Sequence, residues 1–367
     1  MGKTVLITGG AGFIGSHFTE YLIQQYPDYQ LRVLDALTYA GRRENLAAVD
    51  GDTRFTFIHG DVRDRQAVQQ AMQGVHWVVH FAAETHVDRS ILKPDAFITT
   101  DVYGTFMMLE TARQMGVERF VHVSTDEVYG STEQGAFTEQ SPLQPSSPYA
   151  ASKAGADLLA QAYHRTYGLP VLIVRPSNTY GPRQYPEKLI PFFTVRALHD
   201  QPLPLYGDGQ QRRDWLYVLD HARAIDVVLH KGQVGEAYNI AGGNERTNIE
   251  VSRLILHILG KPESLIQFVK DRPAHDRRYA LNDSKLRALG WQPEAEFATA
   301  LRMRPCCGTL NILNGGSRFC KSKPSIGSSC RRGTAGAAPL KRKTERLENL
   351  CVFWKNSWAN LLCIRCA

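Results

Sequence analysis

The sequence predicts an α/β protein in which a doubly wound parallel sheet is followed by a smaller, mixed α/β lobe. Short apolar runs alternate with helix-like segments from Lys3 to Arg175, which is the pattern of repeated βαβ units. A glycine-rich turn directly follows the first apolar run, as is typical of the first βα turn of such sheets. From Pro176 onwards, prolines and glycines divide the chain into short elements. We therefore expect residues 1–175 to form the sheet domain, which also receives some later segments, and residues 176–302 to form the lobe.

The composition is that of a soluble protein whose basic charge is confined to one end. Of its 367 residues, 43% are hydrophobic and 22% are charged, which is ordinary for a globular chain. Residues 303–367 contain 12 Lys and Arg but 2 Asp and Glu, so the net charge of +7 hides a net charge of −3 over residues 1–302. All seven cysteines lie beyond residue 305, and we find no cleavable leader and no run of about 18 apolar residues. We expect a cytoplasmic protein with no nucleic-acid partner and no membrane segment.

The first strand and the turn after it carry a dinucleotide-binding pattern. Lys3–Ile7 is apolar, and the following T-G-G-A-G-F-I-G, with glycines at 9, 12 and 15, would lead into a helix over Gly12–Gln25. Glycine there permits a tight turn, close approach of a pyrophosphate to backbone N–H groups, and close packing of helix on strand. The second strand, Leu31–Leu34, ends at Asp35, twenty residues after Gly15. A carboxylate there would bind ribose hydroxyls and repel a 2′-phosphate, which predicts a Rossmann-type domain that binds NAD; a purely structural turn is the alternative.

Two further βα units place candidate groups at the ends of their strands. Phe55–His59 is a strand followed by Asp61 and Val62, which would present a carboxylate and an amide to the adenine. A helix over Arg65–Met72 leads to a strand at Trp77–Phe81, after which small residues leave room for a cofactor.

A long amphipathic helix is then predicted over Pro94–Met115. It starts at a proline, which suits the first helical turn, and its apolar face makes it a candidate for a dimer contact. Packing within the monomer is the alternative. No metal site is predicted, because His86, just before this helix, has no partner at metal-ligand spacing.

The next strand and helix bring together groups suited to proton transfer. Phe120–Val123 is typical of a buried strand, so the S-T-D-E run at 124–127 would emerge at its carboxyl end. Tyr149 and Lys153 lie four residues apart in a helix-like segment, which stacks both side chains on one face. We expect the Lys153 ammonium to stabilise the Tyr149 phenolate and so to lower its pKa, because an unperturbed tyrosine is a poor base at neutral pH. A surface helix that merely contains Tyr and Lys is the alternative.

The lobe is predicted to bind the rest of a substrate. Its cations Lys188, Arg213 and Arg272 suit phosphates, because a guanidinium forks onto oxyanions, although a solvated surface charge is the commoner role of any one cation. The elements expected here are strands at Val171–Arg175, Ala237–Ile240 and Ile266–Val269, and helices at Leu189–His199, Leu219–His230 and Ile249–Leu259.

Motifs distributed over Met1–Leu301 carry a family resemblance. Among them are TGGAGFIGS, FAAETHVDRS, STDEVYG, YAASKAGAD, RPSNTYGPRQYPEKLIP and DRPAHDRRYALNDSKL. Together they resemble the dTDP-glucose 4,6-dehydratases, which are extended short-chain dehydrogenases/reductases. The resemblance implies a hydro-lyase that uses tightly bound NAD catalytically, takes dTDP-glucose as its substrate and forms a homodimer.

The same resemblance implies roles for five residues. Thr125, Tyr149 and Lys153 match the family's oxidation apparatus, in which the tyrosine takes the proton of the glucose C4 hydroxyl while a hydride passes to NAD. Asp126 and Glu127 match its dehydration pair, with Glu127 abstracting the C5 proton and protonated Asp126 donating to the departing C6 hydroxyl. Two neighbouring carboxyls are expected to titrate apart, as such paired roles require. A helix cap or solvated turn is the structural alternative for the pair.

The remaining site residues are implied by matching positions. Thr179 departs from the family pattern where a second Asn is common, and Ala274 departs where the motif D-R-P-G-H-D has Gly. The implied cofactor contacts are Gly9, Gly12, Phe13, Ile14, Gly15, Asp35, Leu37, Thr38, Asp61, Val62, Ala82, Ala83, Tyr149 and Lys153. The implied substrate contacts are Thr85, His86, Asp88, Asn178, Glu187, Lys188, Arg213, Asn248, Arg272 and His275.

Residues 303–367 do not continue the family pattern. Cysteine, serine, glycine and basic residues become frequent there, and we expect an aberrant, poorly ordered tail; a reading-frame shift is our hypothesis for its origin. Two alternatives to a dTDP-glucose 4,6-dehydratase stay open. The chain would be a 4,6-dehydratase of UDP-glucose or another nucleotide-glucose, or an inactive NAD-binding scaffold.

Overall fold

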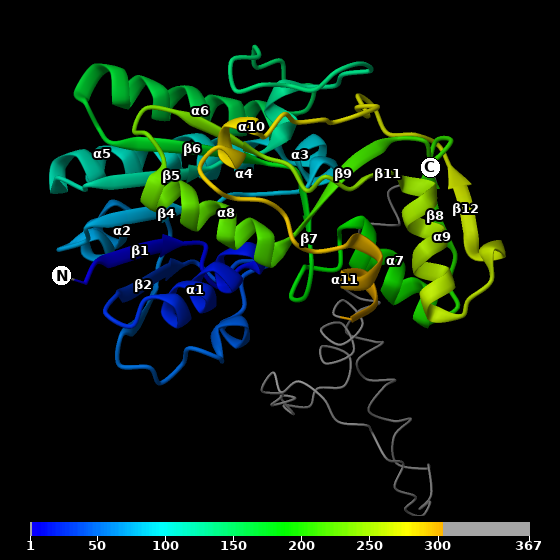
Figure 1. Ribbon diagram of the computed structural model, residues 1–367, viewed down its shortest axis with the longest axis horizontal. Helices are drawn as coiled ribbons and strands as arrows, with labels where there is room; N and C mark the ends of the chain where they lie inside the picture. The colour runs from blue at the N-terminus through cyan, green and yellow to red at the C-terminus, as the bar shows by residue number, and fades with distance from the viewer. Residues whose placement is uncertain (1, 304–367) are drawn as a thin grey trace, which may run out of the picture. The chain divides into compact units, whose positions relative to one another are not determined.

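The computed structural model describes residues 2–303 and confirms the predicted α/β class. Its main feature is a seven-stranded sheet in the order β10-β6-β5-β4-β1-β2-β3, with every neighbouring pair parallel (Figure 1). The order reverses between β1 and β4, which creates the crevice where sheets of this kind bind ligands. The strands are β1 (Thr4–Thr8), β2 (Gln30–Asp35), β3 (Phe55–His59), β4 (Trp77–His80), β5 (Arg119–Val123), β6 (Val171–Pro176) and β10 (Ala237–Ile240).

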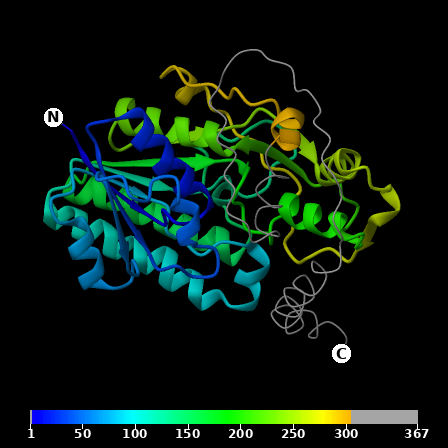
Figure 2. The same cartoon turned by 90° about the horizontal axis from the view of Figure 1, so that it is seen from below.

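Helices cover both faces of this sheet, as the two views in Figures 1 and 2 show. α1 (Phe13–Gln25) and α8 (Val218–Lys231) pack together on one face. α2 (Arg65–Met72), α5 (Thr105–Met115) and α6 (Pro148–Tyr167) cover the other.

Burial on both faces explains the uninterrupted apolar strands in the sequence. Val5 and Ile7 of β1 belong to the apolar cluster under α1 and α8, whereas Leu6 belongs to the cluster under α2, α5 and α6. Because successive side chains of a strand point to opposite faces, a strand between two helical layers is apolar at most positions.

Local signals set the ends of α6, the helix that carries Tyr149. The Ser147 hydroxyl accepts a hydrogen bond from the backbone N–H of Ala150 at 3.1 Å, and Pro148 occupies the first helical turn. At the other end, Gly168 takes a left-handed conformation with φ of +69°, which a Cβ would disfavour.

The lobe is built from two small sheets and a helical layer. Its strands form a three-stranded sheet in the order β11-β9-β7 and a parallel pair of β12 with β8. An apolar core that includes Tyr180, Phe193, Trp215 and Phe297 joins these sheets to the helices. The elements are β7 (Asn178–Tyr180), β8 (Leu203–Tyr206), β9 (Arg212–Tyr217), β11 (Glu245–Thr247), β12 (Ile266–Val269), α7 (Leu189–Leu198), α9 (Asn248–Leu259) and α11 (Phe297–Met303).

Strand β9 separates two neighbouring arginines. Arg213 is buried, whereas Arg212 points to the opposite, exposed side of the strand. The next residue, Asp214, accepts hydrogen bonds from the backbone N–H groups of Gly242 at 2.5 Å and Asn244 at 2.6 Å.

Most predicted elements occur within two residues of their expected ends, and β3, α2, β10 and β12 match their expected bounds. The predicted helix over Pro94–Met115 differs, because it is divided into α4 (Pro94–Phe97), a π-helical segment η2 (Ile98–Gly104) and α5. The short strands β7, β8, β9 and β11 were not predicted, because each is short and is stabilised by a partner distant in sequence.

Within residues 2–303, no helix is both long and apolar enough to cross a membrane. The predicted tail from residue 304 onwards lies outside the described residues, so its order and origin stay hypotheses. The domain boundary at residue 175 also stays a prediction. Both α8 and β10 follow that residue in sequence yet pack into the main sheet and its helical layer.

Candidate active site

The residues predicted to carry out the chemistry meet at the carboxyl ends of β4, β5 and β6. At the end of β5, Thr125 is the N-cap of a short 3-10 helix, η3 (Asp126–Tyr129), and its hydroxyl accepts a hydrogen bond from the backbone N–H of Glu127 at 3.3 Å. Capping was the structural alternative for Asp126 and Glu127, but Thr125 is the residue that caps this turn. Capping fixes the direction in which the two carboxyl groups leave the strand.

Asp126 and Glu127 have different electrostatic surroundings. Asp126 is 2% exposed, and burial and the neighbouring Glu127 hold its pKa well above the ordinary value. Burial also raises the pKa of Glu127, but Lys188, Arg272 and Arg213 oppose that rise. The site therefore favours a protonated Asp126 beside a Glu127 whose anion faces three cations, which gives one proton donor and one proton acceptor.

Tyr149 and Lys153 are both buried on one face of α6, as their spacing predicts. The expected lowering of the Tyr149 pKa is wrong for this structure, because burial, Glu127 and Asp101 together raise it. Hydrogen bonding with Thr85 and Thr125 opposes this rise. The Lys153 ammonium donates to the carbonyl oxygen of Val123 at 2.8 Å, and burial lowers its pKa.

Cations of the lobe face the carboxyl pair. Arg213 is 6% exposed, donates to the carbonyl oxygen of Asp276 at 2.9 Å, and lies over the ring of Tyr279 with its Cζ 4.2 Å from the ring centroid. Lys188 donates to the Thr85 hydroxyl at 3.3 Å, which connects the lobe to the loop after β4.

A second group of predicted substrate contacts lies around that loop. His86 has φ of +98°, and its Nε2 lies 3.2 Å from the carbonyl oxygen of Glu187, while burial lowers its pKa to about 3. Asp88 accepts from Tyr206 at 3.1 Å and from Arg272 at 3.4 Å. These contacts bring the predicted substrate residues of two distant segments together.

His275 and Asn248 lie further along the same surface of the lobe. The Nδ1 of His275 is 2.6 Å from Asp271, and Asp271 also accepts from the side chain of Gln211 at 2.9 Å. The backbone carbonyl oxygen of Gln211 accepts from the backbone N–H of Asn248, the first residue of α9, at 3.0 Å. Ala274 has φ of +50°, which explains why glycine suits this position, and the Thr179 hydroxyl lies 3.0 Å from Nδ1 of His221.

Several buried polar atoms at these strand ends have no partner among the described residues. They are Oγ of Ser124, Oδ2 of Asp126, Oδ1 of Asn178, Nδ1 of His86 and Nε of Arg272. Buried polar groups are normally hydrogen-bonded, so this concentration marks a surface suited to a polar ligand.

The glycine-rich turn fits a dinucleotide. Gly9 has φ of +68°, and a Cβ on it would lie 2.8 Å from the backbone nitrogen of Ala82; a Cβ on Gly15 would lie 2.4 Å from the Gly9 carbonyl oxygen. The N-cap of α1 is Gly12, with no side-chain cap, so the first N–H groups at Phe13 and Ile14 are free of a capping side chain and suit a pyrophosphate.

Asp35 is placed at the end of β2 as predicted. Its carboxylate accepts from the backbone N–H of Ala11 at 2.9 Å and of Leu37 at 2.8 Å, which leaves lone pairs for ribose hydroxyls. Thr38 follows in the same loop, whose residue Leu37 has φ of +50°.

The two residues predicted to contact the adenine, Asp61 and Val62, are already engaged or covered within the protein. Asp61 forms a bidentate ion pair with Arg63, which lowers its pKa, and Val62 is buried. Ala82 donates its N–H to the Thr8 hydroxyl at 3.2 Å, and Ala83 follows it in the loop after β4.

Comparison with known proteins agrees with this arrangement. A family model described as GDP-mannose 4,6-dehydratase matches residues 6–304. The chain belongs to this family.

Relatives within the family cover most of the chain. The dTDP-glucose 4,6-dehydratase of Actinoplanes sp. is 48% identical over 303 residues, which are 81% of this chain and 95% of that protein. A crystal structure of DesIV, a dTDP-glucose 4,6-dehydratase from Streptomyces venezuelae with NAD and TYD bound, has 52% identity and a TM-score of 0.81, covering 83% of this chain and 96% of that chain. The trifunctional UDP-glucose 4,6-dehydratase RHM2 of Arabidopsis thaliana is 46% identical over 307 residues, 82% of this chain and 46% of that protein.

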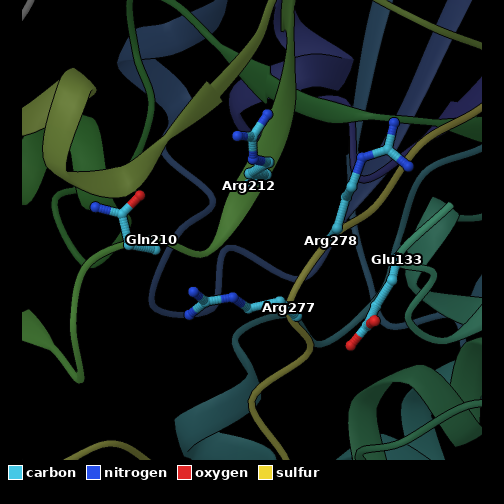
Figure 3. Close-up of a pocket in the computed structure, with 5 residues that line it drawn as sticks. All are labelled: Glu133, Gln210, Arg212, Arg277 and Arg278. Carbon is cyan, nitrogen blue, oxygen red and sulfur yellow. The ribbon is translucent and has the colours of Figure 1, made fainter.

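A hollow of about 190 Å³ also lies on the outer side of β9. Figure 3 shows its lining residues, Glu133, Gln210, Arg212, Arg277 and Arg278. Arg277 forms a bidentate pair with Asp208, and Arg278 pairs with Glu245. Because these guanidinium groups already have acidic partners, the hollow is not a strong anion site.

Sequence reasoning missed several residues that support the site. Beneath the strand ends, the buried carboxylate of Asp157 accepts from Arg175 at 2.8 Å and lies 3.4 Å from Nε2 of His122. Tyr39 donates to Glu187 at 3.1 Å and so links the cofactor loop to the lobe. Asp157 lies four residues after Lys153 on α6, and this spacing is the one signal that would have indicated it.

Proposed function

We propose that this chain is a dTDP-glucose 4,6-dehydratase that uses bound NAD and releases a 4-keto-6-deoxy sugar nucleotide. The observation that carries the proposal is the pair of adjacent carboxyl groups, Asp126 and Glu127, between Tyr149 on one side and the lobe's cations on the other. A dehydratase needs a proton acceptor and a proton donor beside an alcohol-oxidising base, and this arrangement supplies all three.

The proposed roles follow the charge states that the surroundings favour. Tyr149 takes the proton of the C4 hydroxyl, and the Thr125 and Thr85 hydroxyls hydrogen-bond its oxygen and favour its anion. Bound NAD would supply the redox chemistry by accepting a hydride from C4 and returning one to C6. After oxidation of C4, the C5 proton becomes acidic and Glu127 removes it; the same residue would return this proton to C5 once C6 has received the hydride. Asp126, protonated because it is buried, donates its proton to the departing C6 hydroxyl, which leaves as water.

The remaining predicted contacts are proposed to hold the two ligands. Lys188, Arg213 and Arg272 would neutralise the diphosphate, and Asp35 with the glycine turn would hold the dinucleotide. No net oxidation occurs, because the electrons removed at C4 are returned at C6.

The proposal is tested by incubating the purified full chain with dTDP-glucose and following the ultraviolet absorbance of a 4-ketosugar in alkali. Glu127→Gln should retain C4 oxidation but lose elimination, whereas Tyr149→Phe should lose both. A folded protein that binds NAD but forms no ketosugar would instead support an inactive scaffold.

A second candidate substrate is UDP-glucose, which the similarity to the Arabidopsis protein favours. The two substrates differ in the base and in the ribose 2′-hydroxyl. Parallel turnover measurements with dTDP-, UDP- and CDP-glucose at limiting concentration decide between them, because kcat/KM ratios report differential transition-state binding.

We also propose a cytoplasmic homodimer. Ile98 and Tyr103 on η2 and Leu158 and Tyr167 on α6 are each about half exposed, between 48% and 57%. Large apolar side chains gathered on two packed helices favour an isologous contact, and sedimentation analysis of the full chain with Leu158→Glu would test it. The absence of cysteine from residues 1–305 suits a reducing compartment.

A further inference from the structure

The π-helical segment η2 places a carboxyl group in the interior, next to the proposed catalytic pair. Asp101 is 1% exposed and lies in the middle of η2, between α4 and α5. A π-helical turn inserts one extra residue into a helix, and such turns are frequently found at functional sites. The proposed mechanism makes no use of this carboxyl group.

Asp101 links the loop after β4 to α6. Its Oδ1 accepts from the backbone N–H of Glu84, in the loop after β4, at 2.7 Å. Its Oδ2 lies 2.7 Å from the hydroxyl of Ser152, which precedes Lys153 on α6. Both contacts are buried or partly buried, so solvent does not screen them strongly.

The hydrogen bonds around Asp101 are compatible with either an ionised or a protonated carboxyl group. The Ser152 hydroxyl has one proton but two acceptors within reach, Oδ2 of Asp101 at 2.7 Å and the Tyr149 carbonyl oxygen at 2.8 Å. If Asp101 is ionised, it accepts a hydrogen bond from the Ser152 hydroxyl. If Asp101 is protonated, it donates to Ser152 Oγ, and Ser152 donates to the Tyr149 carbonyl.

Charged and titratable groups face Asp101 from each neighbouring element. Lys153 and Tyr149 do so from α6, and Glu84 does so from the loop after β4. On the α5 side, Thr105 lies 3.1 Å from Nε2 of His80, a ring whose pKa burial lowers to about 3. Arg63 lies beyond Gly104, where a Cβ would come within 3.9 Å of its Cγ.

Electrostatic coupling within this group runs in both directions. Burial raises the pKa of Asp101 to about 7, and Lys153 opposes that rise. Ionised Asp101 in turn favours the charged form of Lys153 and raises the pKa of Tyr149. A single proton on Asp101 therefore changes the field at the phenol of Tyr149.

We propose that Asp101 is a positioning residue that sets the ionisation of Tyr149 and Lys153 by holding or releasing one proton inside the site. The proposal rests on the proposed function in that it takes Tyr149 as the base. When Asp101 is neutral, the Tyr149 phenolate forms more readily; when Asp101 is ionised, the phenol keeps its proton.

Asp101→Asn tests this with little change in shape. The amide oxygen can accept from the Glu84 N–H and the amide nitrogen can donate to Ser152, so the variant copies the neutral state at every pH. We expect the acid limb of the kcat–pH profile to move to lower pH by about one unit, the size of one charge acting at short range in a protein interior. Ser152→Ala should move the limb in the same direction by less, because it removes the donor that stabilises ionised Asp101. Asp226→Asn, at the opposite end of the sheet, is the matched carboxyl control and should not move it.

A second measurement does not depend on turnover. The absorbance of tyrosinate is followed as pH rises in the wild type and in Asp101→Asn. Each titration is repeated in the same protein with Tyr149→Phe added, and the difference between the two curves gives the titration of Tyr149. We expect its titration to begin about one pH unit lower in Asp101→Asn. Coincident titrations, or a fall in plateau kcat without a shift of the limb, would overturn the proposal, since a merely structural residue gives that result. A shifted titration in a protein that does not convert dTDP-glucose would support the coupling and reject the proposed function.

Discussion

Two walls of the candidate site are built in different ways. The strand-end wall, which comprises Thr125, Asp126, Glu127, Tyr149 and Lys153, is held by regular elements, β5 with its capped turn and α6. The cation wall, which comprises Lys188, Arg213, Arg272 and His275, comes mainly from loops and strand edges of the lobe.

The difference concerns charge as well as architecture. Burial pushes the groups of the strand-end wall toward their neutral forms, raising the pKa of Asp126 and Tyr149 and lowering that of Lys153. In the cation wall the two guanidinium groups keep permanent charge, although burial lowers the pKa of Lys188 and His275. Changes in the first wall should therefore alter kcat, whereas changes in the second should alter KM.

The largest expected effect is loss of the phenol in the strand-end wall. Tyr149→Phe should lower kcat by about a thousandfold, because it removes the proposed base for the C4 hydroxyl and general-base catalysis contributes about that much. Single-turnover absorbance of the reduced nicotinamide measures C4 oxidation directly. Tyr163→Phe on the same helix removes a hydroxyl bonded to Glu110 and should leave kcat unchanged. Equal losses in both variants would contradict the assignment.

The buried ion pair between Arg175 and Asp157, beneath the strand-end wall, should contribute to the free energy of unfolding. Arg175→Met leaves the carboxylate of Asp157 buried without its main partner, so the free energy of unfolding should fall by about 3–5 kcal/mol. Denaturant titration measures it. Replacing both partners, as in Asp157→Leu with Arg175→Met, should cost less than the single change, and a larger loss in the double variant would show that the pair is not the source of the effect.

A change in the cation wall should affect binding. Arg213→Lys keeps the charge but loses the fork and the stacking on Tyr279, so KM for dTDP-glucose should rise about tenfold with a smaller change in kcat. Arg212→Lys, one residue away on the opposite side of β9, is the matched control. A fall in kcat alone for Arg213→Lys would mean that the two walls do not divide binding from chemistry.

The smallest effect is expected far from both walls. His230 on α8 lies 2.9 Å from Asp226, and although burial opposes it, this contact raises the His230 pKa. A raised folded-state pKa stabilises the protein fully below the unfolded value of about 6.5 and loses that contribution as pH rises through the folded value. Asp226→Asn should therefore destabilise the protein by less than about 1 kcal/mol at pH 5.5 and by little at pH 8.5, because the pair is partly exposed. Thermal unfolding at both pH values checks the sign, and kcat should not change.

The same contrast explains what the sequence could predict. The strand-end wall was predicted because its residues follow strong local signals: a buried strand before 124–127 and the four-residue spacing of Tyr149 and Lys153. For the cation wall, charge alone indicated that Lys188, Arg213 and Arg272 suit phosphates, and the motif resemblance added His275. Their meeting at one site could not be predicted locally, since Arg213 and Arg272 lie in segments whose partners are distant in sequence. The strands β7, β9 and β11 were missed for the same reason.

Electrostatic details were harder to predict than positions. The sequence places Lys153 near Tyr149 but does not reveal that both are buried beside Asp101 and Glu127, which reverses the expected shift of the Tyr149 pKa. Asp101 itself was hidden because the Pro94–Met115 pattern predicts an ordinary helix, and the π-helical turn changes which face this residue occupies.

Strand β9 makes the site sensitive to a slip of a single residue. Arg212 and Arg213 carry the same side chain. A one-residue shift in the pairing of β9 would therefore exchange them without changing the charge on either side of the strand. The carboxylate of Asp214 removes that ambiguity, because its two bonds to the backbone at Gly242 and Asn244 can form in one alignment only. Asp214, which is not one of the predicted substrate contacts, thus fixes which of the two arginines is buried on the side of the candidate site.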